Sequence, residues 1–375
     1  MNFPTAYTDI IDRINKTDPG KYAAGRNYID GTVSYLSPYI SRGVISTKQV
    51  LDSLLAKGYN LDQMEKFIQE LAWREYFQRV WQQLGDDMFD DIRRSNTGTR
   101  HRYLPAALQE AKTGIHAIDK GINELYETGY MHNHLRMYTA SIACNIGKAY
   151  WEMPSKWMYY HLLDGDIASN TCSWQWVAGS FSSKQYFCNQ ENINKYTRSH
   201  QVYSFLDKPY HELPLMPVPD ELKLTTPVQF ITELPENSTP FIDTSLPILL
   251  YNSYNLDPLW RNDSKVNRIL LLEPSHFKQF PVSGKVIDFI LSLAKNIEGI
   301  QVFTGEISDI PFINKVPAIL SKEHPAFMHY PGQKEARDWM FPEVTGFYNS
   351  FFGFWKKCER ILKNIQHQKP ELMRA

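Results

Sequence analysis

Three side chains able to contact a ligand share one face of a predicted helix in the middle of the chain. Asn133, Arg136 and Met137 stand at positions i, i+3 and i+4, so in a helix they point together. On spacing alone, the arginine and the asparagine are more often solvated surface residues. The spacing therefore marks a candidate site without identifying its ligand.

A second helix carries an acid, a large ring and a cation with the same spacing. Glu70, Trp73 and Arg74 occur at i, i+3 and i+4 within ELAWREYF, residues 70–77. On spacing alone, an amphipathic helix with one buried tryptophan and a solvated ion pair is the favoured interpretation. A ligand-binding face is the alternative.

The elements that must position these residues change character along the chain. Residues 1–204 read as a helical domain, with long runs of helical apolar spacing such as residues 60–84. Residues 205–245 are rich in proline and predict an irregular connector.

The last segment, residues 246–375, predicts a small α/β domain. Short apolar runs at 246–252, 267–274 and 300–306 predict buried strands, and an amphipathic helix separates the last two. Strand, helix and strand form a parallel βαβ unit, followed by a C-terminal helix around residues 342–366. The expected fold is mainly α, with this α/β domain after the helical one.

Composition is that of a folded soluble protein. The 375 residues are 43% hydrophobic and 22% charged, and no run is long and apolar enough to span a bilayer. No secretory signal is evident, so we expect a cytoplasmic protein. The net charge is −1, so DNA binding would need a local basic patch. Four scattered cysteines without a CxxC pair predict neither zinc nor a disulfide framework, and no metal is expected.

Four segments in order resemble the FAD-binding region of the cryptochrome/photolyase family. They are GTVSYLSPYISRGVIS at 31–46, ELAWREYF at 70–77, residues 113–145 and residues 161–180. The resemblance covers about residues 20 to 200 and implies a light-driven flavoprotein. The family usually places an α/β antenna domain before this region, whereas here an α/β segment follows it, so an antenna chromophore stays an open question.

The resemblance implies a site for each end of FAD. Hydroxyls near a helix start suit the pyrophosphate, and the residues assigned to that end are Tyr22, Thr32, Ser34 and Ser37. At the ring end it implies an Arg136–Asp164 pair beside the isoalloxazine, Asp166 on its pyrimidine edge and Asn170 opposite N5, with Asn133 nearby. A buried aspartate also requires such a partner on physical grounds. Asparagine opposite N5 favours a repair enzyme, because photolyases carry it there.

The resemblance further implies a pocket for a flipped-out cyclobutane pyrimidine dimer. Glu70 would hydrogen-bond the dimer and Trp73 would pack against it; the remaining residues assigned to this pocket are Asn133, Met137 and Trp176. Arg26 and Arg74 are assigned to DNA contact. Enzymes for the (6-4) lesion carry histidines at the positions of Asn133 and Met137. His132 and His134 flank the position and are expected to point elsewhere.

Electron supply to the flavin is the last implied function. Trp174 and Trp151 match the first two members of the family's tryptophan chain, and the third is missing, with Tyr103 or Trp157 as possible substitutes.

The expected activity is FAD-dependent repair of pyrimidine dimers in UV-damaged DNA. A blue-light receptor without repair activity is the alternative, and a protein that has lost light chemistry is a third. The oligomeric state stays open, with a monomer favoured.

Overall fold

The protein forms two compact units whose segments interleave along the chain. The computed structural model describes residues 2–96 and 98–372, and side chains of the last helix up to residue 365. Unit 1 contains residues 21–33 and 84–230, whereas unit 2 contains residues 2–20, 34–83 and the chain from residue 231 onward. The division into 1–204, 205–245 and 246–375 stays a prediction about domains.

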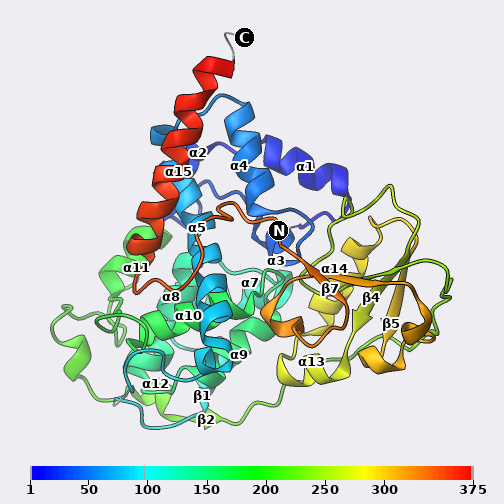
Figure 1. Ribbon diagram of the computed structural model, residues 1–375. Coiled ribbons are helices and arrows are strands. Elements are labelled where there is room, and N and C mark those ends of the chain that lie inside the picture. Colours follow the sequence, from blue (N-terminus) through cyan, green and yellow to red (C-terminus); the bar gives the residue numbers. More distant parts are fainter. Residues whose placement is uncertain (1, 97, 373–375) are drawn as a thin grey trace. The chain divides into compact units, whose positions relative to one another are not determined.

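Unit 1 is helical, and Figure 1 shows its main helices in cyan to green. Apolar residues at helical spacing form its core, as on α7, where Ile118, Ile122 and Leu125 are fully buried. α7 ends at Gly129, whose φ of 72° suits a glycine cap. The helices of this unit are α6 (Ala106–Gln109), α7 (His116–Thr128), α8 (Asn133–Ser141), α9 (Glu152–His161), α10 (Ile167–Ala178), α11 (Gln190–Thr197) and α12 (Asp220–Lys223).

Shorter elements complete unit 1. One turn of π-helix, η2 (Ile142–Ile146), continues α8. The other short elements are the 3-10 helices η1 (Gly85–Phe89) and η3 (Leu213–Leu215), and the antiparallel pair β1 (Leu104–Pro105) and β2 (Thr225–Thr226). This pair joins the Pro-rich segment to the helical body.

Unit 2 combines N-terminal helices with the C-terminal part of the chain. The predicted helix at 60–84 is confirmed as α5 (Leu61–Leu84), with Met64, Phe67, Ile68 and Leu71 buried at helical spacing. The other helices are α1 (Tyr7–Asn15), α2 (Pro19–Gly25, continuing into unit 1), α3 (Ser37–Ser41), α4 (Thr47–Ala56), α13 (Pro274–Gln279), α14 (Gly284–Ala294), α15 (Phe351–Leu372) and the 3-10 helices η4 (Ile307–Asp309), η5 (Ile313–Lys315) and η6 (Pro325–Phe327).

A parallel five-stranded sheet forms the α/β part of unit 2, in the order β5-β4-β3-β6-β7. Its strands are β3 (Ile248–Tyr251), β4 (Asn267–Leu272), β5 (Ile300–Thr304), β6 (Ile319–Lys322) and β7 (Gln333–Glu335). Figure 1 shows α13 and α14 beside β4 and β5. The predicted fold class is therefore confirmed, together with the three predicted strands. The sequence did not reveal β6 and β7, which are short and partly polar.

Among the residues that the structure describes, no helix is long and apolar enough to cross a membrane. The same part of the chain holds no cluster of three or more His, Cys, Asp or Glu side chains arranged to bind a metal. The four cysteines, Cys144, Cys172, Cys188 and Cys358, are buried thiols.

Candidate functional site

A buried ion pair in unit 1 joins two of the predicted ring-end residues. Nη2 of Arg136 on α8 lies 3.0 Å from Oδ1 and 2.9 Å from Oδ2 of Asp164, in the loop before α10. The arginine Nε donates to the carbonyl of Met131 at 2.7 Å, and its guanidinium lies over the ring of Tyr130. The side chain of Asp164 is 5% exposed and that of Arg136 is 21% exposed. The charge of the aspartate is thus compensated within a largely dry site.

The next two predicted residues, Asp166 and Asn170, lie at the start of α10, shortly after Asp164 in the sequence. Asp166 is buried and caps the helix, accepting from the backbone N–H of Ser169 at 2.7 Å. Asn170 donates through Nδ2 to the carbonyl of Ser155 at 3.0 Å. The buried hydroxyl of Ser169 has no hydrogen-bond partner among the described residues. This hydroxyl is a polar group that a bound ligand can satisfy, and the sequence analysis had not singled it out.

The residues predicted for the phosphate end come from both units. Half-buried Tyr22 lies in α2 and exposed Thr32 in the following loop, both in unit 1. Half-buried Ser34 and Ser37 belong to unit 2, where Ser37 is the first residue of α3. Their common contact with a pyrophosphate remains a prediction.

The two histidines beside Asn133 contact the protein itself: His132 caps α8, and His134 packs against an aromatic ring. His132 caps α8, and its Nδ1 accepts from the N–H of His134 at 3.2 Å. The ring of His134 packs near Tyr196 with centroids 5.1 Å apart. Burial, followed by the charges of His134 and Arg136, lowers the pKa of His132 to about 4. Burial, followed by Arg26, lowers the pKa of His134 to about 4, so both rings are neutral near pH 7.

The two tryptophans predicted to carry electrons lie in the same hydrophobic core of unit 1. Trp174 is 3% exposed and Trp151 is 2% exposed. Nε1 of Trp151 donates to Oδ1 of Asp91 at 2.8 Å. The ring of Tyr150 lies 5.4 Å from that of Trp151, so it is a further aromatic neighbour that the sequence analysis missed. Tyr150 adjoins Trp151 in sequence, which is the signal that could have found it.

The predicted lesion residues of unit 1 are accessible. Asn133 is exposed at the start of α8, Met137 is half-buried one turn later, and Trp176 on α10 is 38% exposed. The ring of Trp176 lies 5.8 Å from that of Tyr186. An exposed tryptophan can stack on a base, although no contact among the three lesion residues is established.

The lesion residues predicted on α5 lie in unit 2, and one of them has an unexpected partner. Glu70, Trp73 and Arg74 are all half-buried, and Nη1 of Arg74 donates to Oγ of Ser41 at 2.9 Å. The ring of Phe351, the first residue of α15, stacks on Trp73 with centroids 3.7 Å apart and an interplanar angle of 10°. One face of the ring assigned to lesion stacking is therefore covered by this chain's own C-terminal helix.

Comparison with known proteins identifies the class of the helical region. Residues 67–208 match the model of the FAD binding domain of DNA photolyase. A deoxyribodipyrimidine photo-lyase of Alkalihalophilus pseudofirmus is 32% identical over 163 residues, which are 42% of this chain and 34% of the relative. One from Agrobacterium fabrum is 30% identical over 182 residues, covering 46% of this chain and 38% of the relative. Residues 67–208 are thus similar to the FAD binding domain of DNA photolyase, over less than half of the chain.

Similarity to solved structures is partial. A cryptochrome of Synechocystis has 23% sequence identity and a TM-score of 0.47, with 52% of this chain and 44% of that chain covered. The chain spans little more than a third of the length of the two curated relatives. The similarity to the family is therefore confined to the helical region that contains residues 67–208.

Proposed function

We propose that this protein binds FAD noncovalently and uses light to repair cyclobutane pyrimidine dimers in DNA. The observation that carries the proposal is the ion pair between Arg136 on α8 and Asp164, which precedes α10. The cap and the first turn of α10 supply Asp166 and Asn170. These residues have the donors and acceptors that a flavin ring requires, and they lie within the segment that matches the FAD-binding family model.

In this proposal each residue has a defined role toward the cofactor. Bound and reduced, FAD would supply the electron for splitting the dimer, and the protein would supply position and electrostatics. Arg136 would hold a positive charge at the flavin, and Asp164 fixes the orientation of its guanidinium. Asp166 would accept a hydrogen bond from the flavin, and the amide of Asn170 would donate one to it. The partly buried position of the pair limits the access of water and so strengthens these interactions.

The substrate part of the proposal rests on two faces. Asn133 and Met137 stand where a (6-4) enzyme would carry histidines, and the neighbouring His132 has its Nδ1 engaged in capping α8. Glu70 would hydrogen-bond the dimer, and Trp73 would stack on it, worth about 1–3 kcal/mol of binding. Cyclobutane dimers should therefore be repaired, and (6-4) products should remain intact.

A blue-light receptor without repair activity is the second candidate, and one observation favours it. Phe351 stacks on Trp73, so a lesion base cannot use that face of the Trp73 ring while the ring of Phe351 stays in place. Phe351 is 2% exposed, which makes the contact part of the packing of unit 2.

A repair assay with matched variants distinguishes the two candidates. Protein with reduced FAD is illuminated with oligonucleotides that contain one cyclobutane dimer or one (6-4) product, and intact bases are quantified. Phe351→Ala uncovers Trp73, whereas Phe352→Ala truncates an adjacent ring that is 69% exposed. Melting curves verify that each variant folds.

The repair proposal expects dimer repair by the wild type and by Phe352→Ala, with dimer binding about threefold to tenfold tighter in Phe351→Ala. If wild type and Phe351→Ala both carry FAD yet leave dimers intact in single- and double-stranded DNA, repair is refuted and the light-receptor function takes its place. A protein that cannot bind FAD would refute both candidates.

A further inference from the structure

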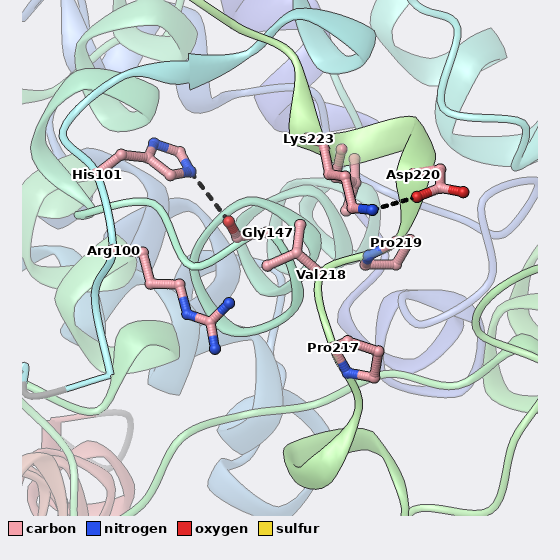
Figure 2. Close-up of a pocket in the computed structure, with 9 residues that line it drawn as sticks. Arg100, His101, Gly147, Pro217, Val218, Pro219, Asp220 and Lys223 are labelled. Atoms are coloured by element: carbon pink, nitrogen blue, oxygen red, sulfur yellow. Dashed lines mark hydrogen bonds and ion pairs between the residues drawn. The ribbon is translucent and has the colours of Figure 1, made fainter.

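An open pocket lies in unit 1, at the place where the Pro-rich segment passes the start of the helical body. It has a volume of about 510 Å³, a size typical of small-molecule sites. Figure 2 shows the guanidinium of Arg100 extending into the space in front of Pro217 and Val218. The residues that line the pocket are Arg100, His101, Gly147, Pro217, Val218, Pro219, Asp220, Leu222 and Lys223.

The charges around this pocket favour an anion. Lys223 and Asp220 pair with each other at 2.5 Å, which leaves Arg100 as the net charge of the lining. Within the described residues, no carboxylate lies within ion-pair distance of Arg100. Burial, followed by the charge of Arg100, lowers the pKa of the nearby Lys148. The cations Arg100 and Lys148 repel each other, and an anion bound beside Arg100 would relieve that repulsion.

The other walls restrict the kind of molecule that fits. Nε2 of His101 donates to the carbonyl of Gly147 at 3.0 Å, and its Nδ1 accepts from the N–H of Tyr103 at 3.3 Å, so this ring is held as a rigid wall. The faces of Pro219 and Val218 are apolar. A flat body that carries a single negative charge satisfies both the apolar wall and Arg100.

Backbone hydrogen bonding connects the pocket wall to Tyr150, whose ring neighbours that of Trp151. The N–H of Tyr150 donates to the carbonyl of His101 at 2.8 Å, and His101 pairs with Ala149 in a parallel bridge. The ring of Tyr150 lies 5.4 Å from that of Trp151. Tyr150 thus has its backbone bonded to a residue of the pocket wall, and its half-buried ring is the aromatic neighbour of Trp151.

We infer that this pocket binds a small, flat, anionic reductant of the enediol type and that Tyr150 relays its electron to Trp151. The inference rests on the proposed function, in which light draws an electron from Trp174 and Trp151 to FAD. Every electron that leaves Trp151 in this way must be replaced from outside the protein. A donor bound in this pocket would supply that electron by way of Tyr150, whose backbone is bonded to His101 of the pocket wall.

The exchange balances in electrons and protons. Oxidised Trp151 takes one electron from Tyr150, and the hydroxyl proton of Tyr150 passes to the carboxylate of Asp91. The reductant then gives one electron to the Tyr150 radical, the proton returns from Asp91, and the reductant loses its own proton to water. Asp91 is well placed because it already accepts from Nε1 of Trp151 at 2.8 Å. Burial and then Asp91 raise the pKa of Tyr150 to about 12, so its oxidation requires such a proton acceptor.

The first test is binding in the dark, with ascorbate as the probe. Saturation-transfer NMR of anaerobic, FAD-loaded protein measures the dissociation constant of ascorbate without any photochemistry. Arg100→Gln should raise this constant about fivefold, equivalent to ~1 kcal/mol. Lys120→Gln is the matched control, because it removes one positive charge from an exposed residue of α7 outside the pocket. The control should bind ascorbate as the wild type does.

The second test is the rate of flavin photoreduction as the reductant concentration is varied. Arg100→Gln should raise the half-saturating concentration of ascorbate about fivefold and leave the rate with neutral dithiothreitol unchanged. Added salt should raise the half-saturating concentration of ascorbate but not that of neutral dithiothreitol, because salt screens the charge of Arg100. Tyr150→Phe should slow photoreduction with ascorbate even at saturation, because phenylalanine cannot take part in the relay.

Each outcome decides the matter. Equal ascorbate binding by wild type and Arg100→Gln would overturn the site. Binding that depends on Arg100, without any change in photoreduction, would overturn the reductant role and leave only an anion site. Normal photoreduction in Tyr150→Phe would overturn the relay. Failure of the wild type to bind FAD or to be photoreduced would refute the proposed function and the reductant role, whereas the dark titration would still decide whether the pocket binds the anion.

Discussion

Removing the carboxylate of Asp164 tests the ring-end site most directly. In Asp164→Ala the guanidinium of Arg136 loses both contacts, of 3.0 Å and 2.9 Å, and keeps its bond to the carbonyl of Met131. Breaking a fully buried pair costs about 3–5 kcal/mol. Because 21% of the Arg136 side chain is exposed, water compensates part of the charge, and we expect a cost of about 2–3 kcal/mol.

The assay combines urea denaturation with the FAD content of the purified protein. Asp30→Ala is the control, since Asp30 pairs with Arg198 in the same unit but both side chains are more than half exposed. That change should cost less than about 1 kcal/mol. The double variant Arg136→Ala/Asp164→Ala should be more stable than Asp164→Ala alone, because no unpaired charge remains. Equal stability and FAD content in Asp164→Ala and Asp30→Ala would refute the importance of the pair.

Three further predictions concern electrons, protons and substrate. Trp174→Phe should strongly suppress flavin photoreduction, whereas Trp260→Phe in unit 2 should leave it unchanged; equal rates would exclude this route. Because the pKa of His132 is about 4 in the folded protein and about 6.5 in the unfolded chain, only the unfolded state gains a proton as the pH falls below 6.5. Stability should thus fall by roughly 1.6 kcal/mol between pH 6.5 and 5 for this group, and His132→Asn should remove this contribution to the slope in urea titrations. Glu70→Ala should lower the dimer-repair yield per absorbed photon more than it lowers dimer binding, and a parallel loss of both would contradict a role in the chemistry.

Local patterns predicted the elements that depend on local sequence. The apolar spacing of residues 60–84 gave α5, and the runs of aliphatic residues gave β3, β4 and β5. β7 was missed because its sequence is Gln-Lys-Glu and it pairs only with β6, at the edge of the sheet. Side chains on such an edge need not be apolar, so no hydrophobic pattern marks it.

Contacts between distant segments could not be read from periodicity. The Pro-rich segment suggests a linear division into domains, which stays a prediction. No local pattern indicates that residues 2–20 and 34–83 belong to the same compact unit as the C-terminal part. Glu75 illustrates the reason: its carboxylate accepts from Oγ1 of Thr47 and from the N–H groups of Met340 and Phe341, at 2.6, 2.6 and 3.3 Å. A buried acid on α5 needs hydrogen-bond donors, but its sequence does not say which segment supplies them.

If the protein repairs dimers, the stacking of Phe351 on Trp73 affects how a lesion base reaches Trp73. An aromatic pair is worth about 0.5–1.5 kcal/mol beyond burial, and burying a phenylalanine about 1.5–3 kcal/mol more. A stacked base returns about 1–3 kcal/mol, so exchanging one ring for the other costs about 1–1.5 kcal/mol net. Releasing the whole segment would cost more, because Glu75 also holds Met340, and Tyr76 donates to the carbonyl of Tyr348. Stacking of a lesion base on the covered face of Trp73 therefore requires the ring of Phe351 to leave while its helix stays folded, and the Phe351→Ala comparison tests this step.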